Sequence, residues 1–138
     1  PFCLFFVVLS ACSNEANTKT QLQDIKNFSK ISDHLASSGM PSENELSIIK
    51  KSGYKHVISL LPGNQNEERD QVAAINLTFD QIPVAWGDPK LEDFEQFVSL
   101  MDKYGKDKVL VHCAMNYRAS AFSYLYQVIQ NPENQGDA

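Results

Sequence analysis

The sequence predicts an α/β fold with a mainly parallel central sheet and helices on both of its faces. From Phe28 onward, segments with the pattern of strands alternate with segments that have the period of helices. The run KVLVH, residues 108–112, is apolar almost throughout, as is typical of a strand that a parallel sheet buries on both faces. A helix between successive strands also supplies the crossover that parallel strands require.

Length and composition limit the class of protein. With 138 residues, 43% hydrophobic and 21% charged, the chain is long enough for one domain with its own core, without disulfides or metals. The formal net charge of −5 argues against nonspecific nucleic-acid binding, which depends on clustered Lys and Arg. We therefore expect one domain over residues 28–138, with no nucleic-acid partner and no cofactor. Whether that domain continues beyond residue 138 stays open.

The N-terminus has the pattern of a bacterial lipoprotein signal. Phe2–Leu9 is an uncharged apolar run, too short for a membrane-spanning helix of about 20 residues but suited to the core of a secretory signal. LSAC, residues 9–12, then resembles the lipobox of bacterial lipoproteins, in which the signal is cut before a cysteine that becomes acylated. The resemblance implies a signal peptide over residues 1–11, incomplete at its start because the chain begins with Pro1. The alternative is a buried apolar strand that ends in these four residues.

The lipobox resemblance also implies a location. Acyl chains on Cys12 would anchor the protein in a membrane, and Ser13 in place of an Asp resembles lipoproteins sorted to the outer membrane and facing the periplasm. Residues 13–26 are polar and lack apolar periodicity, so we expect the lipidated cysteine and a flexible tether over residues 12–27. Cys3 would leave with the signal, which makes Cys113 the only free thiol in an oxidising compartment. Such a thiol is either deeply buried or used in chemistry.

The individual elements follow from local signals. Ser42 and Glu45 have the spacing of a capping box, and Gly53 follows as a stop signal. Leu91, Phe94 and later apolar residues recur at three- and four-residue steps in the clearest helix. The expected elements are short strands in 28–39, a helix over 41–53, a strand over 55–61, a helix over 64–76, a strand over 77–84, a helix over 89–105, a strand over 108–112 and a helix over 118–130.

The stretch from His112 to Ser120 has the residues of a catalytic loop. Cys113 follows a strand that we expect to be central, and ligands of open α/β sheets bind at the carboxyl ends of strands. A helix N-terminus follows, whose free N–H groups favour anions and stabilise a thiolate. Arg118 can hold a tetrahedral oxyanion with its planar fork of donors. These groups suit nucleophilic attack on a bound oxyanion ester; the alternative for Cys113 is a small buried hydrophobic residue.

The loop VHCAMNYRAS resembles the active-site loop of cysteine-dependent protein tyrosine and dual-specificity phosphatases, whose pattern is His-Cys-x5-Arg-Ser/Thr. Residues 35–62 and 79–86 further resemble the small bacterial phosphatase-like (DUF442-type) domains related to β-lactamase-hydrolase-like proteins. The resemblance implies a dual-specificity-phosphatase-like fold and a substrate that is a phosphorylated protein or a small phosphoester.

The resemblance also implies roles for single residues. Cys113 would be the nucleophile that forms a cysteinyl-phosphate, and His112 would help to set its pKa. Arg118 would bind the phosphoryl group, and Ser120 would hydrogen-bond the sulfur as it leaves. The phosphate-binding loop would consist of Ala114, Met115, Asn116, Tyr117 and Arg118.

This loop departs from the phosphatase pattern in its length. Four residues separate Cys113 from Arg118, where the family has five, so Ala119 stands at the family's Arg position. Asn116 replaces the usual Gly, and Asn tolerates left-handed backbone angles well. Because rhodanese sulfurtransferases have a six-residue loop, a sulfurtransferase with a Cys113 persulfide is an alternative. A non-catalytic module that binds phosphate or another anion is a further alternative.

The other polar residues are less specific. A phosphatase needs an acid for the leaving oxygen, and Asp88, on a loop before the long helix, is the candidate that the resemblance favours; a turn or cap residue is the alternative, and Asp80 lies within a strand. His34 and His56 lack metal-ligand spacing, so we expect no metal site. The run NEERD, residues 66–70, is expected to be a solvated helix start, and Trp86 a loop anchor.

Overall fold

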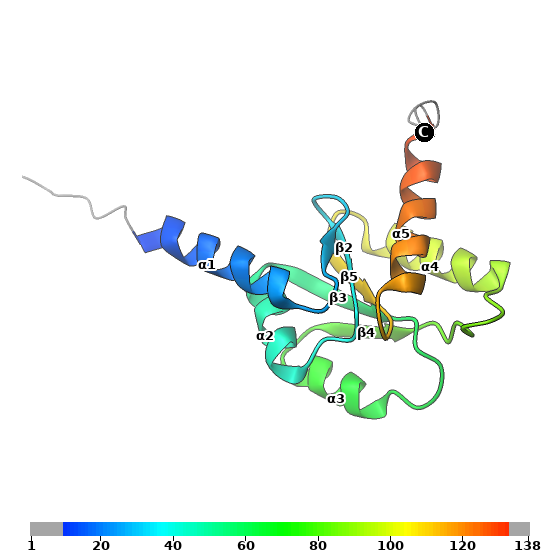
Figure 1. The fold of residues 1–138 in the computed structure, drawn as a ribbon, viewed down its shortest axis with the longest axis horizontal. Coiled ribbons are helices and arrows are strands. Elements are labelled where there is room, and N and C mark those ends of the chain that lie inside the picture. The colour runs from blue at the N-terminus through cyan, green and yellow to red at the C-terminus, as the bar shows by residue number, and fades with distance from the viewer. Residues whose placement is uncertain (1–9, 133–138) are drawn as a thin grey trace, which may run out of the picture.

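The computed structural model describes residues 10–132, which form one five-stranded sheet between two helical layers (Figure 1). The elements are α1 (Ser10–Asp24), β1 (Ser29–Lys30), β2 (Leu35–Ser38), α2 (Glu43–Lys51), β3 (Tyr54–Ser59), α3 (Asn66–Ala74), β4 (Thr78–Gln81), α4 (Leu91–Tyr104), β5 (Lys108–His112) and α5 (Tyr117–Gln130). No helix within residues 10–132 has the length and hydropathy that a membrane span requires.

The sheet confirms the α/β prediction. Its strand order is β1-β2-β5-β3-β4, and only the β1–β2 pair is antiparallel. β5 pairs in parallel with β2 on one side and with β3 on the other, so it is the central strand, as the apolar run predicted. Ser38 of β2 and Ser59 of β3 both pair with His112, which aligns three carboxyl ends at one edge. Cys113 follows directly at that edge.

The two faces of the sheet bury separate cores because side chains alternate along each strand. Val109 and Val111 of β5 face one core with α4 and α5, whereas Leu110 faces the other core with α1, α2 and α3. Figure 1 shows the same division, with α1, α2 and α3 on one side of the sheet and α4 and α5 on the other. The first core contains Phe97 and Phe122, whose rings lie 5.9 Å apart. Cys113 belongs to this first core.

Helix α2 begins where the sequence predicts it. The Ser42 side chain accepts from the Glu45 N–H, and the Glu45 carboxylate accepts from the Ser42 N–H at 2.7 Å, which completes the capping box. Such a cap stabilises a helix by about 1 kcal/mol. Gly53, with φ of +89°, follows the helix and turns the chain into β3.

The predicted flexible tether is wrong for its second half. Residues Ser10–Asp24 form α1, and Leu22 and Ile25 are buried against α2 in the second core. The tether prediction rested on the absence of a sustained apolar period, but two apolar residues three positions apart at the end of the segment are enough to dock one turn. The packed domain therefore begins before Phe28. Residues 1–9, which hold most of the expected signal peptide, lie outside the described residues.

Candidate active site

Cys113 lies at the carboxyl end of the central strand, where the sequence placed it. Cys113 is 1% exposed, and its backbone N–H donates to Ser38 O at 3.3 Å. The chain then turns through three residues, Ala114 to Asn116, into α5. The thiol therefore lies below a loop of backbone groups at the start of a helix, as an anion-binding loop requires.

The loop lowers the pKa of the Cys113 thiol. Burial alone would raise the pKa, because it disfavours the thiolate. The backbone N–H groups of Ala119, Met115 and Arg118 donate to the sulfur and, with the charge of the Arg118 guanidinium, they outweigh burial. The pKa of this thiol consequently lies below its ordinary value, which is the condition for a nucleophilic cysteine at neutral pH.

Asn116 gives the loop its turn. Its φ of +76° and ψ of −2° lie in the left-handed region, as the replacement of Gly by Asn predicted. Its side-chain Nδ2 donates to Asn27 O at 2.6 Å, and Asn27 Nδ2 donates to Met115 O at 3.0 Å. These two side-chain amides, which we call the amide pair, each donate to a backbone carbonyl of the other segment. They join the segment before β1 to the loop. Sequence reasoning missed Asn27, which lies 89 residues from Asn116.

Gly39 allows a close approach between β2 and the loop. It forms an isolated bridge with Met115, and a Cβ atom on it would meet Lys26 Cγ at 2.9 Å and Ala114 O at 3.0 Å. Any larger residue would push the loop away from β2. The loop is therefore held from one side by Gly39 and by the amide pair of Asn27 and Asn116.

Arg118 connects the loop to the segment after β4. Its guanidinium NH1 donates to Val84 O at 2.7 Å, and its Cζ lies 5.6 Å from the Trp86 ring centroid. Its Nε is buried and has no hydrogen-bond partner within residues 10–132. A buried unpaired donor costs free energy unless a ligand satisfies it. One N–H of the guanidinium is thus occupied by the protein, and its Nε–H is left without a partner within residues 10–132.

Trp86, which the sequence predicted to be a loop anchor, is 67% exposed. Its ring contacts Arg118 and lies edge-on to the Tyr117 ring at 5.9 Å. Tyr117 is itself 63% exposed. These two aromatic residues therefore flank the guanidinium at the surface.

His112 points to the opposite face of the sheet from Cys113. Its Nε2 lies 2.5 Å from Glu68 Oε1, and both side chains are almost completely buried. The contact has the distance of an ion pair but not the angles of an aligned hydrogen bond. The role in setting the pKa of Cys113 that the resemblance implies for His112 stays a prediction. The imidazole Nδ1 lies 3.5 Å from Cys113 O, so it contacts the loop through the backbone.

Glu68 corrects the expectation that residues 66–70 are a solvated helix start. The carboxylate is buried against His112, while its neighbours Glu67 and Arg69 are exposed. The signal was present in the sequence, because Glu68 lies four positions before Val72, the buried residue of the same helix. Helical spacing therefore placed Glu68 on the buried face.

The side chains of Ser120 and Asp88 have partners other than Cys113. The Ser120 hydroxyl donates to Tyr117 O at 3.0 Å, so among the described residues it bonds to its own helix and not to the sulfur. Asp88 lies on the exposed loop that also holds Trp86, and its carboxylate forms a short ion pair with Lys90. The carboxylate that caps α4 is that of Asp93, which accepts from the Lys90 N–H at 3.0 Å. Lys90 is the residue before α4.

The remaining polar candidates are satisfied within the protein. His56 Nε2 lies 3.0 Å from Asp107 Oδ2, its Nδ1 lies 2.5 Å from Thr78 Oγ1, and its ring stacks on Tyr104. Asp80 accepts a short hydrogen bond from the Tyr104 hydroxyl. Within residues 10–132, no three His, Cys, Asp or Glu side chains are grouped as a metal site needs.

Comparison with known proteins supports a phosphatase-like fold and function. A crystal structure from Shewanella putrefaciens CN-32, described as "Putative phosphatase (DUF442)", is 40% identical, covers 85% of this chain and 80% of its own, and superposes with a TM-score of 0.79. The core catalytic domain of the PP-IP phosphatase SIW14 from S. cerevisiae is 15% identical over 78% of this chain and 68% of its own, with a TM-score of 0.69.

A further structure, P. aeruginosa TpbA in complex with pTyr, is 18% identical over 76% of this chain and 64% of its own, with a TM-score of 0.65. The likeness to SIW14 and to TpbA shows the fold alone. No protein-family model matches the chain, and neither does any curated protein.

Proposed function

This chain belongs to the DUF442 family of phosphatase-like proteins, and from that premise we propose that it hydrolyses a phosphoester through a cysteinyl-phosphate intermediate. The observation that carries the proposal is the position of Cys113, which is buried at the end of the central strand and directly before the loop that leads into α5. Backbone donors from the start of α5 surround this thiol, and Arg118 leaves its buried Nε unpaired beside them. A thiolate and unpaired donors in one place fit a tetrahedral oxyanion ester.

The proposed reaction has two displacements at phosphorus. The Cys113 thiolate forms an S–P bond as the P–O bond to the leaving group breaks. Water then attacks the phosphorus, the S–P bond breaks and the thiolate returns. The backbone N–H groups and Arg118 bind the equatorial oxygens, whose charge is greatest in the transition state. The substrate class is a phosphorylated protein or a small phosphoester.

Asp88 is the proposed general acid of the first displacement. Its loop is joined to the phosphate-binding loop, because Arg118 bonds to Val84 and packs on Trp86. A proton from its carboxyl group would pass to the leaving oxygen, and the resulting carboxylate would accept a proton from water in the second displacement. The ion pair with Lys90 must open for this to happen.

The test is phosphate release from p-nitrophenyl phosphate by the purified full chain. We expect turnover that is abolished by Cys113→Ser, together with a phosphorylated Cys113 trapped by acid quenching in the single-turnover regime. No turnover with aryl, alkyl and peptide phosphates would overturn the proposal. Sulfur transfer from thiosulfate to cyanide would instead support the sulfurtransferase alternative.

One observation favours a non-catalytic phosphate-binding module as the second candidate. The Arg118 guanidinium already donates to Val84 O and packs against Trp86, so the shortened loop leaves only part of its fork free. Such an arrangement would bind an oxyanion without activating it fully. Saturable vanadate binding without turnover would single out this candidate.

We also propose that the chain is a periplasm-facing lipoprotein, anchored in the outer membrane through Cys12. The support is the lipobox-like tetrapeptide of residues 9–12, most of which lies outside the described side chains. Incorporation of radiolabelled palmitate, lost in Cys12→Ala expressed with a complete signal, is the expected result. Equal labelling of both proteins would overturn this proposal.

A further inference from the structure

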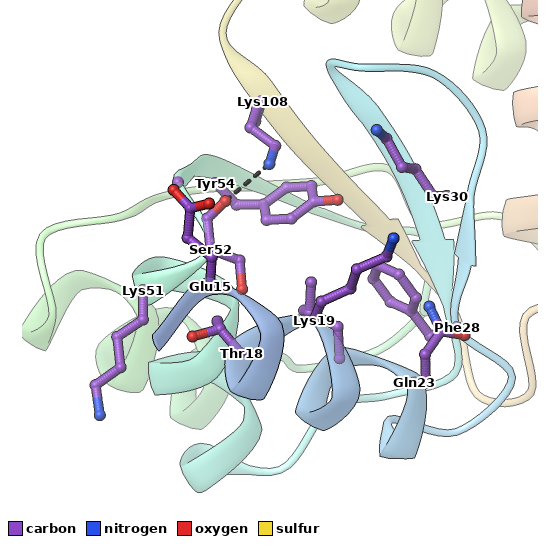
Figure 2. Close-up of a pocket in the computed structure, with 12 residues that line it drawn as sticks. Glu15, Thr18, Lys19, Gln23, Phe28, Lys30, Lys51, Ser52, Tyr54 and Lys108 are labelled. Atoms are coloured by element: carbon purple, nitrogen blue, oxygen red, sulfur yellow. Dashed lines mark hydrogen bonds between the residues drawn. The ribbon is translucent and has the colours of Figure 1, made fainter. Parts of the chain in front are cut away.

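A second concave site lies at the end of the sheet opposite Cys113. It has a volume of about 600 Å³, a size typical of small-molecule sites. We call it the basal pocket and define it by the side chains used below. They are Lys19, Leu22, Phe28, Lys30, Tyr54 and Lys108. Tyr54 and Lys108 begin β3 and β5 and pair with each other, whereas Cys113 follows the other end of β5 (Figure 2). The basal pocket is therefore separate from the candidate active site.

The basal pocket is basic in a chain whose net charge is −5. Figure 2 shows the amines of Lys19, Lys30 and Lys108 around the pocket, while the Lys51 amine points away from them. The carboxylates that face this group are those of Glu15, on the pocket wall, and of Asp33, 3.0 Å from Lys30 Nζ. Positive side chains therefore outnumber the acidic ones in the pocket.

Lys108 is half-buried at the edge of the pocket. Its Nζ donates to Ser52 O at 2.8 Å and lies 4.6 Å from the Tyr54 ring centroid. Burial and then the nearby charge of Lys30 lower the pKa of Lys108. An anion between the two amines would relieve this repulsion, because it would place opposite charge close to both.

Tyr54 supplies a hydroxyl group inside the pocket. The residue is 3% exposed. Figure 2 shows the hydroxyl pointing to the side of the pocket where Lys19 and Lys30 lie. Burial raises the pKa of Tyr54 to about 12, so the hydroxyl stays protonated and donates at neutral pH. The hydroxyl is therefore available as a hydrogen-bond donor to a ligand in the pocket.

We propose that the basal pocket binds an organic phosphate, with its anionic group between Lys19, Lys30 and Lys108. The Tyr54 hydroxyl donates to that group. The organic part of the ligand packs against Leu22 and Phe28, which form the apolar wall of the pocket. The same chemistry occurs in soluble phosphate esters and in phospholipid head groups, and the experiment separates these two sources.

The test is titration of the isotopically labelled full chain with phenylphosphonate, a phosphate analogue that is not hydrolysed. We expect saturable shifts of the Gly53 and Lys108 amide signals, apart from any shifts in the catalytic loop. Lys108→Met should weaken this binding about tenfold, as the loss of one charge-assisted hydrogen bond implies. Lys19→Met tests the same site from the exposed side of α1 and does not disturb the sheet. Lys106→Met removes one exposed charge outside the pocket and should leave the affinity unchanged.

A second arm uses vesicles of phosphatidylglycerol, with phosphatidylcholine vesicles as the uncharged control. Binding of phenylphosphonate identifies soluble esters as ligands, and vesicle binding that Lys19→Met weakens identifies a lipid head group. The proposal is overturned when phenylphosphonate shifts only the catalytic loop and the vesicles do not bind. Equal losses in Lys106→Met and Lys108→Met would overturn it as well, because they would show general charge attraction.

Discussion

His112 Nε2 lies 2.5 Å from Glu68 Oε1, and the contact joins the strand before Cys113 to helix α3. We expect Glu68→Gln to lower the free energy of unfolding by about 2 kcal/mol, because it removes the charge beside a buried imidazole and cannot be repaired by water. Urea unfolding measures the change. Glu67→Gln removes an exposed neighbouring charge and should change stability by less than about 0.5 kcal/mol. Equal stability of the two variants would show that the pair contributes nothing.

Cys113 should titrate below the range of an ordinary thiol, whose pKa is about 8.5. We expect the thiolate absorbance at 240 nm, taken as the difference from Cys113→Ser, to rise with a midpoint below that value. Arg118→Met should raise the midpoint, because it removes the guanidinium charge that helps to lower the pKa. A midpoint at or above about 8.5 would contradict the role of the loop donors.

The same shift makes stability depend on pH. Because the folded-state pKa of Cys113 is below the unfolded value, the unfolded chain binds more protons between the two values and stability rises with pH there. The contribution is fully present above about pH 8.5 and is lost as the pH falls through the folded-state pKa. Urea midpoints of the wild type minus those of Cys113→Ser should therefore increase between these limits. If the difference between the two urea midpoints did not change with pH, the Cys113 thiol would not contribute to the pH dependence of stability.

The planar set of N–H donors of the Arg118 guanidinium should contribute more to kcat/KM than its positive charge does. We expect Arg118→Lys to lower kcat/KM by about 10²-fold, because an ammonium group cannot bond to Val84 O and to the substrate in one plane. Assays with p-nitrophenyl phosphate measure the loss. Arg69→Lys alters an exposed arginine over the Phe79 ring and should leave kcat/KM unchanged. Full activity in Arg118→Lys would show that the loop N–H groups alone bind the oxyanion.

The effect of Asp88 should depend on the leaving group. Asp88→Asn is expected to lower kcat about 10²-fold for an alkyl phosphate and much less for p-nitrophenyl phosphate, whose phenolate leaves without protonation. Asp70→Asn, an exposed carboxylate on α3, is the matched control. Equal losses on both substrates would assign Asp88 a structural role beside Lys90.

The sequence predicted what depends on local patterns, and it missed what depends on distant contacts. The α/β class, the central strand and the capping box at Ser42 follow from periodicity and spacing within single segments. The backbone of the Cys113 loop was predictable for the same reason. The partners of Asn27 and Glu68 were not predictable, because each contacts a residue more than 40 positions away; only the burial of Glu68 could be read from its helical spacing to Val72. The contact of His112 with Glu68 was not predicted either; strand alternation turns the imidazole to the face opposite Cys113.

Asn116 should contribute to the loop through both its backbone angle and its amide. Its φ of +76° is one that Gly adopts freely and Ala does not, and its Nδ2 donates to Asn27 O at 2.6 Å. We expect Asn116→Gly to cost about 1 kcal/mol for the lost hydrogen bond. Asn116→Ala should cost about 1 kcal/mol more for the strain. Urea unfolding measures both costs.

Asn76 separates the two contributions to the Asn116 result. It is exposed and also has a positive φ, +59°, so Asn76→Ala and Asn76→Gly differ by backbone strain alone. The difference in stability between the Ala and Gly variants should therefore be similar at the two positions, while of the two Gly variants only Asn116→Gly should be less stable than the wild type. Because the amide pair holds the loop around Cys113, Asn116→Gly should also raise the midpoint of the thiolate titration. Unchanged stability and an unchanged midpoint in Asn116→Gly would show that the left-handed turn alone shapes the loop.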